Sequence, residues 1–160
     1  MSSRPANPAL ELLPRNLPLL LLQARERVIA RFRPILNAHG VTEQQWRIVR
    51  ALLETGPLEP REIVVLCAIS SPSLAGVLAR MEKTGLVARQ RLDHDQRRVK
   101  VSLTPKSRGL ARRIAPEIEA AYVELEATLG AQAVQGLYTT LDDLIGSLAA
   151  DEQAQEPPQD

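Results

Sequence analysis

The chain has 160 residues, enough for one domain with a sizeable core, and 44% of them are hydrophobic but only 2% aromatic. A single cysteine excludes an intramolecular disulfide framework and fits a reducing compartment, so we expect a cytoplasmic protein. The apolar run over residues 17–22 contains Pro18 and is too short to span a bilayer, so we expect no membrane partner.

The net charge of +1 conceals an uneven distribution of charged residues along the chain. Residues 1–79 carry a net charge of +3, residues 80–113 one of +8, and residues 114–160 one of −10. A concentrated basic segment indicates an anionic partner that docks at one place, whereas a merely solvated surface mixes its signs. Arginine outnumbers lysine 17 to 3, which suits bidentate contacts to phosphates and guanine edges, although GC-rich coding gives the same bias.

The N-terminal part predicts an arm followed by a long helix. Residues 1–14 contain three prolines and no sustained periodicity, so we expect a flexible arm. From residue 17 onward apolar residues recur at helical spacing, and we assign residues 15–40 to an N-terminal dimerisation helix. Pro34 is predicted to kink or end this helix, and Gly40 to stop it.

Two short helices are predicted next. Thr42 and Gln45 have the spacing of a capping box, and Gly56 followed by proline ends the helix that they open. A third helix of about eight residues begins near Pro60.

The following helix is the predicted recognition helix. Ser71 is placed to cap it, Pro72 to occupy its first position and Gly85 to end it. Its apolar face consists of Leu74, Val77, Leu78 and Met81. Because only residues 68–70 separate it from the preceding helix, the pair predicts a helix-turn-helix whose second helix enters a groove of double-stranded DNA.

A basic hairpin is predicted after this helix. Two alternating stretches flank the polar turn L-D-H-D-Q, and their expected inner face consists of Leu86, Ala88, Val99, Val101 and Leu103. Arg98 and Lys100 lie on the other face. The fold class is therefore mainly α with a small β-hairpin wing, a winged helix-turn-helix over residues 41–104.

The C-terminal part predicts two more helices over residues 105–150, opened by Thr104 and Pro105 and separated by Gly130, and a disordered tail over residues 151–160. The small winged module cannot cover the apolar faces of the terminal helices. We therefore expect a homodimer in which the terminal helices of two chains intertwine. The alternative is a monomer in which these helices cover each other.

Three motifs, M-E-K-T-G-L-V-A-R, D-H-D-Q-R-R and V-S-L-T-P-K-S-R, resemble those of the MarR family of transcriptional regulators, over about residues 17–150. Asp95 and Arg97 match the D-x-R of the family's wing. The stretch R-F-R-P-I-L-N-A-H-G-V-T-E-Q-Q-W-R resembles the branch that regulates degradation of homoprotocatechuate and related aromatic acids. The resemblance implies a dimeric repressor on a pseudo-palindromic operator, released by a small aromatic or N-heteroaromatic carboxylic acid.

One departure concerns DNA reading. Many family members have Thr-Arg in the middle of the recognition helix, where this chain has Ala75-Gly76. We therefore expect fewer hydrogen bonds to bases, with more weight on apolar contact from Val77 and on DNA shape. The expected DNA-binding residues are Ser71, Ser73, Gly76, Val77, Arg80, Arg89, Arg97 and Arg98. The alternative for the wing arginines is a solvated basic turn.

The resemblance also implies an effector cavity beside Trp46, between the dimer helices and the winged module. Arg15, His39, Trp46 and Arg47 would supply cations, a hydrogen bond and a stacking surface for an aromatic carboxylate, with Arg15 drawn from either subunit.

We expect no enzyme, cofactor or metal site. Asp93, His94 and Asp95 are interpreted as plain loop, Cys67 as inert packing, and no catalytic motif is present in the sequence. Two other functions stay open: a constitutive, weakly specific architectural DNA-binding protein without effector, and a protein-interaction module that uses the winged fold without DNA.

Overall fold

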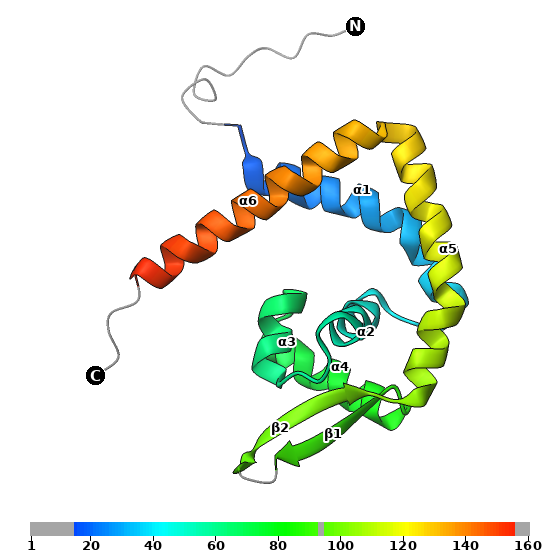
Figure 1. Cartoon of the computed structure of the whole chain (residues 1–160), viewed down its shortest axis with the longest axis vertical. Helices are drawn as coiled ribbons and strands as arrows, with labels where there is room; N and C mark the ends of the chain where they lie inside the picture. The colour runs from blue at the N-terminus through cyan, green and yellow to red at the C-terminus, as the bar shows by residue number, and fades with distance from the viewer. Residues whose placement is uncertain (1–14, 93–94, 156–160) are drawn as a thin grey trace, which may run out of the picture. The chain divides into compact units, whose positions relative to one another are not determined.

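The computed structural model describes residues 15–92 and 95–155, which form six helices and one antiparallel hairpin (Figure 1). In chain order these are α1 (Leu17–Ala38), α2 (Glu43–Thr55), α3 (Pro60–Cys67), α4 (Ser71–Lys83), β1 (Val87–Leu92), β2 (Asp95–Leu103), α5 (Pro105–Leu129) and α6 (Ala131–Gln155). The predicted fold class, a mainly α winged helix-turn-helix, is confirmed. The arm predicted over residues 1–14 lies outside the described residues. The chain divides into two compact units, Met1–Ile114 and Ala115–Asp160.

Most helices begin and end near the residues predicted from the sequence, because capping side chains and glycines fix these boundaries locally. Thr42 Oγ1 accepts a hydrogen bond from the Gln45 N–H at 3.2 Å, and Gln45 Oε1 accepts one from the Thr42 N–H at 3.0 Å, which is the predicted capping box. Gly40 and Gly85 adopt φ of 68° and 73°, left-handed values that end the preceding helices. α1 continues through Pro34 to Ala38, so the proline does not end it.

The start of α4 differs from the prediction by one residue. Ser70, not Ser71, precedes the helix, and its hydroxyl donates to Ser73 Oγ at 3.0 Å and not to the backbone. Pro72 consequently occupies the second helical position, where its missing N–H still removes a donor that has no partner within the helix.

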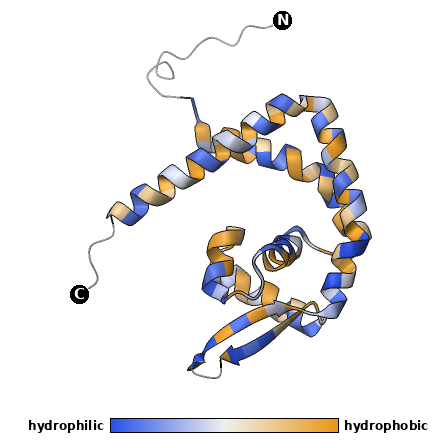
Figure 2. Ribbon diagram, in the orientation of Figure 1, coloured by the Kyte–Doolittle hydropathy of each residue, from blue (hydrophilic) through white to orange (hydrophobic). Residues whose placement is uncertain are grey.

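The core of the first unit forms where α2, α3 and α4 meet the hairpin (Figure 1). α3 and α4 turn by 110° at their short connection, the crossing typical of a helix-turn-helix. Hydrophobic residues, orange in Figure 2, make up much of α3 and part of α4. The most deeply buried side chains include Leu36, Ile48, Val49, Leu52, Ile63, Leu74, Val77, Leu78, Met81, Val101 and Ile114.

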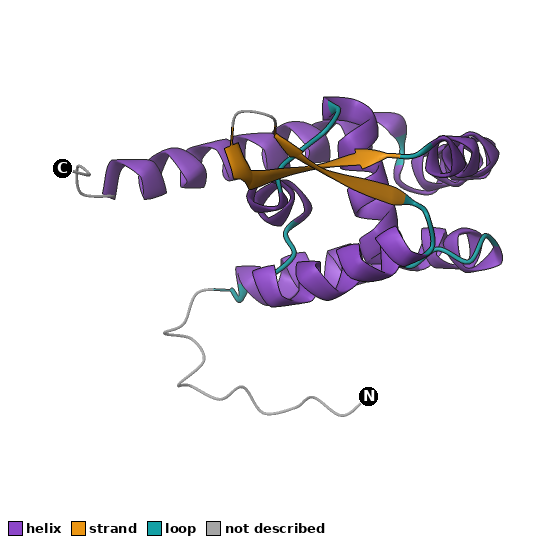
Figure 3. Ribbon diagram, turned by 90° about the horizontal axis from the view of Figure 1, so that it is seen from below, coloured by secondary structure: helices purple, strands orange, loops and turns teal. Residues whose placement is uncertain are grey.

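The hairpin is twisted (Figure 3) and attached to the core along one face. Val87 pairs with Leu103 and Arg89 with Val101. Val87, Val101 and Leu103 are buried while Ala88 is exposed, so the predicted inner position of Ala88 is wrong. Since side chains alternate along a strand, Val87 and not its neighbour must face the core.

A backbone bridge fixes the wing to the segment before α3. The Leu58 N–H donates to Val101 O at 3.0 Å, and the Val101 N–H donates to Leu58 O at 2.7 Å. Leu58 is itself buried. The wing therefore cannot shift along its own direction without breaking these two hydrogen bonds.

The second unit consists of the later part of α5 and of α6, which are separated by Gly130 at φ 88°. α6 extends to Gln155, so Asp151–Gln155 are helical where the sequence predicted disorder. Residues 156–160 lie outside the described part. Several large apolar side chains of this unit are exposed: Tyr122, Val123, Leu129, Leu137, Tyr138, Ile145 and Leu148.

No single helix of the described chain is long and apolar enough to cross a membrane. Only the strongly bent pair α3 and α4 reaches that length and apolarity together.

Replacing Met81, which is fully buried, with alanine should lower the free energy of unfolding by about 2–5 kcal/mol, because apolar burial is lost and a cavity remains. Urea unfolding followed by circular dichroism at one protein concentration measures the change. Val65→Ala is the control, since Val65 on α3 is 78% exposed, and should change this free energy by less than about 0.5 kcal/mol. Equal losses in the two variants would contradict the assigned core.

Candidate nucleic-acid interface and effector site

α4 turns one face to the core and the other to solvent. Val77, to which the sequence assigned DNA contact, is only 1% exposed, so that assignment is wrong. The reason is helical geometry: Val77 follows Leu74 by three residues and precedes Met81 by four, which places all three on one buried stripe. An apolar contact with DNA must come from another residue of this helix.

The solvent face of α4 carries small and polar side chains. Ser71, Ser73, Ala75 and Arg80 are exposed and Gly76 is partly exposed. A Cβ at position 76 would lie 3.5 Å from Arg80 Nη1, an ordinary contact, so the fold itself does not require glycine there. Few hydrogen-bonding groups are available in the middle of this face, and its backbone is open to close approach.

The arginines of the wing differ in their partners. Asp95 Oδ1 accepts a hydrogen bond from the Arg97 backbone N–H at 3.0 Å, which braces the start of β2. The Arg97 side chain is exposed and forms no ion pair with any residue of 15–92 or 95–155. Arg89, in contrast, lies 3.3 Å from Glu82 Oε2.

Arg98 is held by a buried carboxylate that the sequence analysis missed. Glu59 Oε1 accepts hydrogen bonds from Arg98 Nη2 and, at 2.9 Å, from Arg98 Nε, while Arg61 Nε lies 3.2 Å from Glu59 Oε2. The Arg98 guanidinium lowers the pKa of Glu59, and Glu59 in turn raises the pKa of Arg98. We call Glu59, Arg61 and Arg98 the wing junction. The only sequence signal for it was a glutamate directly before Pro60, at the N-cap of α3.

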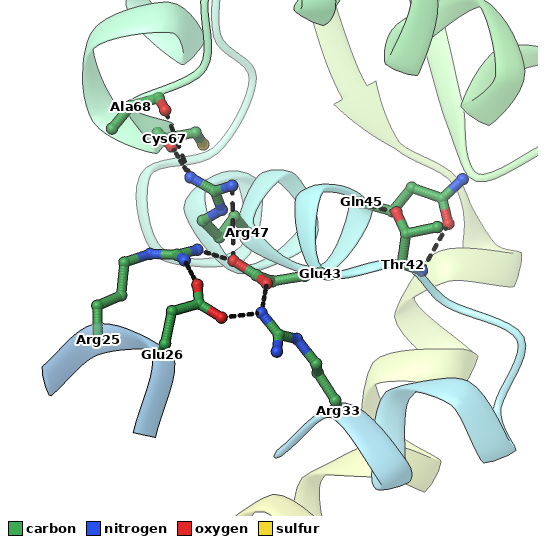
Figure 4. Close-up of polar contacts among 9 residues, drawn as sticks. All are labelled: Arg25, Glu26, Arg33, Thr42, Glu43, Gln45, Arg47, Cys67 and Ala68. Carbon is green, nitrogen blue, oxygen red and sulfur yellow. Dashed lines mark hydrogen bonds and ion pairs between the residues drawn. The ribbon is translucent and has the colours of Figure 1, made fainter. Parts of the chain in front are cut away.

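A second polar cluster joins α1 to α2 (Figure 4). Glu43 on α2 contacts Arg25 and Arg33 of α1, the latter at 3.4 Å. Glu26 of α1 lies 2.7 Å from both arginines, and its hydrogen bond with Arg33 is the main cause of its lowered pKa. Arg47 approaches the same Glu43 carboxylate at 3.7 Å from one turn further along α2.

Arg47 also reaches the turn between α3 and α4. Its Nη1 donates to Cys67 O at 2.6 Å and to Ala68 O at 3.4 Å, the last carbonyls of α3 and of its cap (Figure 4). Ala68 adopts the left-handed conformation, with φ 47°. Burial lowers the pKa of Arg47 and raises that of the Cys67 thiol. Cys67 therefore stays a protonated, weakly nucleophilic packing residue at neutral pH.

Of the four predicted effector residues, His39 lines a described cavity. This cavity has a volume of about 320 Å³, and its polar wall also includes Gln45, Lys106 and Arg113. Trp46 is half-buried and Arg47 faces the α3–α4 turn, and neither lines that cavity. Arg15 is exposed at the start of the described chain.

No metal site is found among the described residues, where no group of three histidines, cysteines or carboxylates could hold an ion. Of the loop considered above, Asp93 and His94 lie outside the described part of the chain.

Comparisons with known proteins agree with the fold. Residues 39–98 match the model of the MarR family. The homoprotocatechuate degradative operon repressor of Escherichia coli is 42% identical over 81% of this chain and 88% of its own length. The solved transcriptional regulator PA4135 is 37% identical, with a TM-score of 0.80 over 90% of this chain and all of that one. NadR, solved with 4-hydroxyphenylacetate, is 37% identical, with a TM-score of 0.71 over 93% of this chain and 98% of that one.

Arg47→Met should lower the free energy of unfolding by about 1.5–3 kcal/mol, since it retains the aliphatic stem and removes charged donors from two carbonyls at the end of α3. Chemical denaturation measures the loss. Arg50→Met on the same helix is the matched control, because Arg50 only pairs with exposed Glu54, and it should cost no more than about 0.5 kcal/mol. A loss no larger than the control's would show that the contacts to the turn do not stabilise it.

Proposed function

The chain belongs to the MarR family, and from this we propose that it is a cytoplasmic, dimeric repressor that binds a pseudo-palindromic operator and is released by a small aromatic carboxylic acid. One observation carries the proposal. The exposed face of α4 and the braced Arg97, which forms no ion pair with the described residues, belong to one winged module, and the segment with the greatest positive charge, residues 80–113, begins in α4 and contains the wing.

The proposed DNA contacts are residues of α4 and of the wing that are exposed to solvent or partly so. Ser71, Ser73 and Arg80 reach the major groove from α4, with Gly76 allowing close approach of the backbone. Arg97 enters the minor groove from the wing, where its backbone is held by Asp95. Arg89 and Arg98 contribute less than their charge implies, because both are paired with carboxylates.

A dimer is supported by the exposed apolar side chains of α1, α5 and α6. In α1 alone Leu17, Leu19, Leu21 and Leu22 are each between 38% and 55% exposed. Contiguous apolar patches of this kind seldom stay open to water, and a second copy is the economical cover. Two α4 helices about 34 Å apart would then enter successive major grooves. The net charge of −10 over residues 114–160 keeps that region away from phosphates.

The proposed effector is an aromatic acid, because the similar NadR was solved with 4-hydroxyphenylacetate and the E. coli relative represses a homoprotocatechuate operon. An N-heteroaromatic acid has the same carboxylate and a similar ring. We assign the aromatic stacking to Trp46, the carboxylate to Arg47 or to Arg15 supplied by either subunit, and a hydrogen bond to His39. Release follows if the acid binds more tightly to a dimer whose α4 spacing does not fit DNA.

A weakly specific architectural protein without effector is the second candidate, favoured by the small side chains at Ala75 and Gly76. It binds operator and scrambled duplexes about equally, whereas the proposed repressor loses roughly 1–3 kcal/mol for each essential base pair that is changed. A gel-shift titration with the region upstream of its own gene and a scrambled version separates the two. Absence of any salt-dependent DNA binding would instead favour a protein-interaction module.

Arg97→Ala should weaken operator binding about tenfold or more, because a groove contact by arginine contributes roughly 1–3 kcal/mol. Fluorescence anisotropy with a labelled operator measures the dissociation constant. Arg31→Ala is the control, since Arg31 is an exposed arginine of α1 and its loss changes the net charge equally. An operator affinity that Arg97→Ala leaves at the level of the control would remove the wing from the proposed interface.

Titration with 4-hydroxyphenylacetate should change the emission of Trp46, the only tryptophan, raise the melting temperature and release the labelled operator. The neutral 4-hydroxyphenylacetamide is the control and should do none of these, since it has no carboxylate. If neither this acid nor 3,4-dihydroxyphenylacetate nor a hydroxynicotinate affects the protein at millimolar concentration, the effector part of the proposal fails while the DNA part stands.

A further inference from the structure

A buried carboxylate lies beneath the wing, where a DNA-binding surface is expected to concentrate cations. Glu59 is only 6% exposed, and both of its oxygens are engaged by the arginines of the wing junction. It follows Leu58, whose backbone is bridged to Val101 of β2. The Glu59–Arg98 pair therefore connects the same two segments as the backbone bridge, on the side nearer the tip of the wing.

Arg97 and Arg98 lie where the register of the hairpin is irregular, between the pairs Arg91–Val99 and Leu92–Asp95, and they differ in their partners. Arg98 is directed to the N-terminus of α3 by two hydrogen bonds with Glu59 Oε1, one through Nε at 2.9 Å and the other through Nη2. Arg97 makes no such pair with the described residues. Among the described residues, one of two adjacent arginines is thus paired with a carboxylate and the other is not.

The ion pair with Glu59 reduces the positive charge that Arg98 presents to a polyanion. Salt-dependent affinity for DNA counts the phosphates that protein cations neutralise, and a guanidinium that already binds a carboxylate releases fewer counterions. The pair also restricts the side chain of Arg98 in β2, and so restricts where the wing can lie relative to α3.

We propose that Glu59 is a specificity-determining residue for operator binding. It withholds the charge of Arg98 from the DNA backbone and fixes the wing against α3, so that discrimination falls to α4 and Arg97. This inference rests on the proposed function, because it concerns how the same surface distinguishes an operator from other DNA.

The first test is Glu59→Gln, which keeps the shape of the side chain and removes its charge. Affinity for a scrambled duplex should rise about fivefold at 0.15 M salt, and the slope of log K against log salt should steepen by about 0.9, because Arg98 gains a phosphate. Affinity for the operator should stay nearly constant, since the gain is offset by a less constrained wing. The operator-to-scrambled ratio should therefore fall about fivefold.

Glu82→Gln is the matched control. It changes the net charge equally and also frees a wing arginine, Arg89, but Glu82 is exposed where Glu59 is buried, and its pair joins the wing to α4 and not to α3. Both duplexes should then bind more tightly by the same factor, which leaves their ratio unchanged. An equal effect of the two variants on the ratio would overturn the proposal.

The double variant Glu59→Gln with Arg98→Gln has the wild-type net charge and leaves only the exposed Arg61 without its carboxylate, so it is also the safer variant for folding. Its salt slope should equal that of the wild type, and its operator-to-scrambled ratio should be lower. A slope shallower by about 0.9 would show that Arg98 already contacts a phosphate in the wild type, which would refute the proposal. So would a double variant that is less stable but keeps the wild-type ratio, since Glu59 would then serve only the fold.

These outcomes are distinct from failure of the proposed function. A wild-type protein that binds no duplex, or binds both equally, refutes the repressor and this role together. A wild-type protein that prefers its operator, with a ratio that Glu59→Gln leaves intact, refutes only the role of Glu59.

Discussion

Burial of one stripe of α4 determines how the rest of the winged module is used. Leu74, Val77, Leu78 and Met81 are each at most 2% exposed, and removing such side chains from water contributes about 25 cal/mol per Å² of apolar surface. With this face fixed against α2, α3 and the hairpin, the opposite face is the only one available to a partner. The same burial leaves Ser71, Ser73 and Arg80 outward and excludes Val77 from contact with DNA.

Local signals predicted the elements, and tertiary context decided the details. The capping box of Thr42 and Gln45 and the glycine stops at positions 40 and 85 depend on neighbouring residues only, and the structure confirms them. Val87, and not Ala88 as predicted, faces the core, because a shift of one residue exchanges the two faces of a strand. Glu59 and Arg98 are 39 residues apart, and no periodicity in the sequence signals that they meet.

The arginines of this chain differ in their roles, and the role of each follows from its position in the fold and not from the number of charges around it in the sequence. Arg25, Arg33 and Arg47 surround Glu43 and connect α1 through α2 to the turn before α4, so they are structural cations. Arg47 reaches the backbone of a turn in which Ala68 adopts a left-handed conformation, which is costly for alanine and is maintained by its surroundings. The contacts of Arg47 with this turn were not visible in the sequence, which indicated only a cation next to Trp46.

The ion pairs of the wing have a consequence for how fast a regulator finds its site. Most of the DNA that such a protein meets is not its operator, and non-specific attraction comes almost entirely from unpaired cations. On the proposed function, the ion pairs of Glu59 with Arg98 and of Glu82 with Arg89 shorten each unproductive encounter with non-operator DNA. The same proposal predicts that these two carboxylates act as built-in counterions of the wing and reduce the time spent on other sequences during the search for the operator.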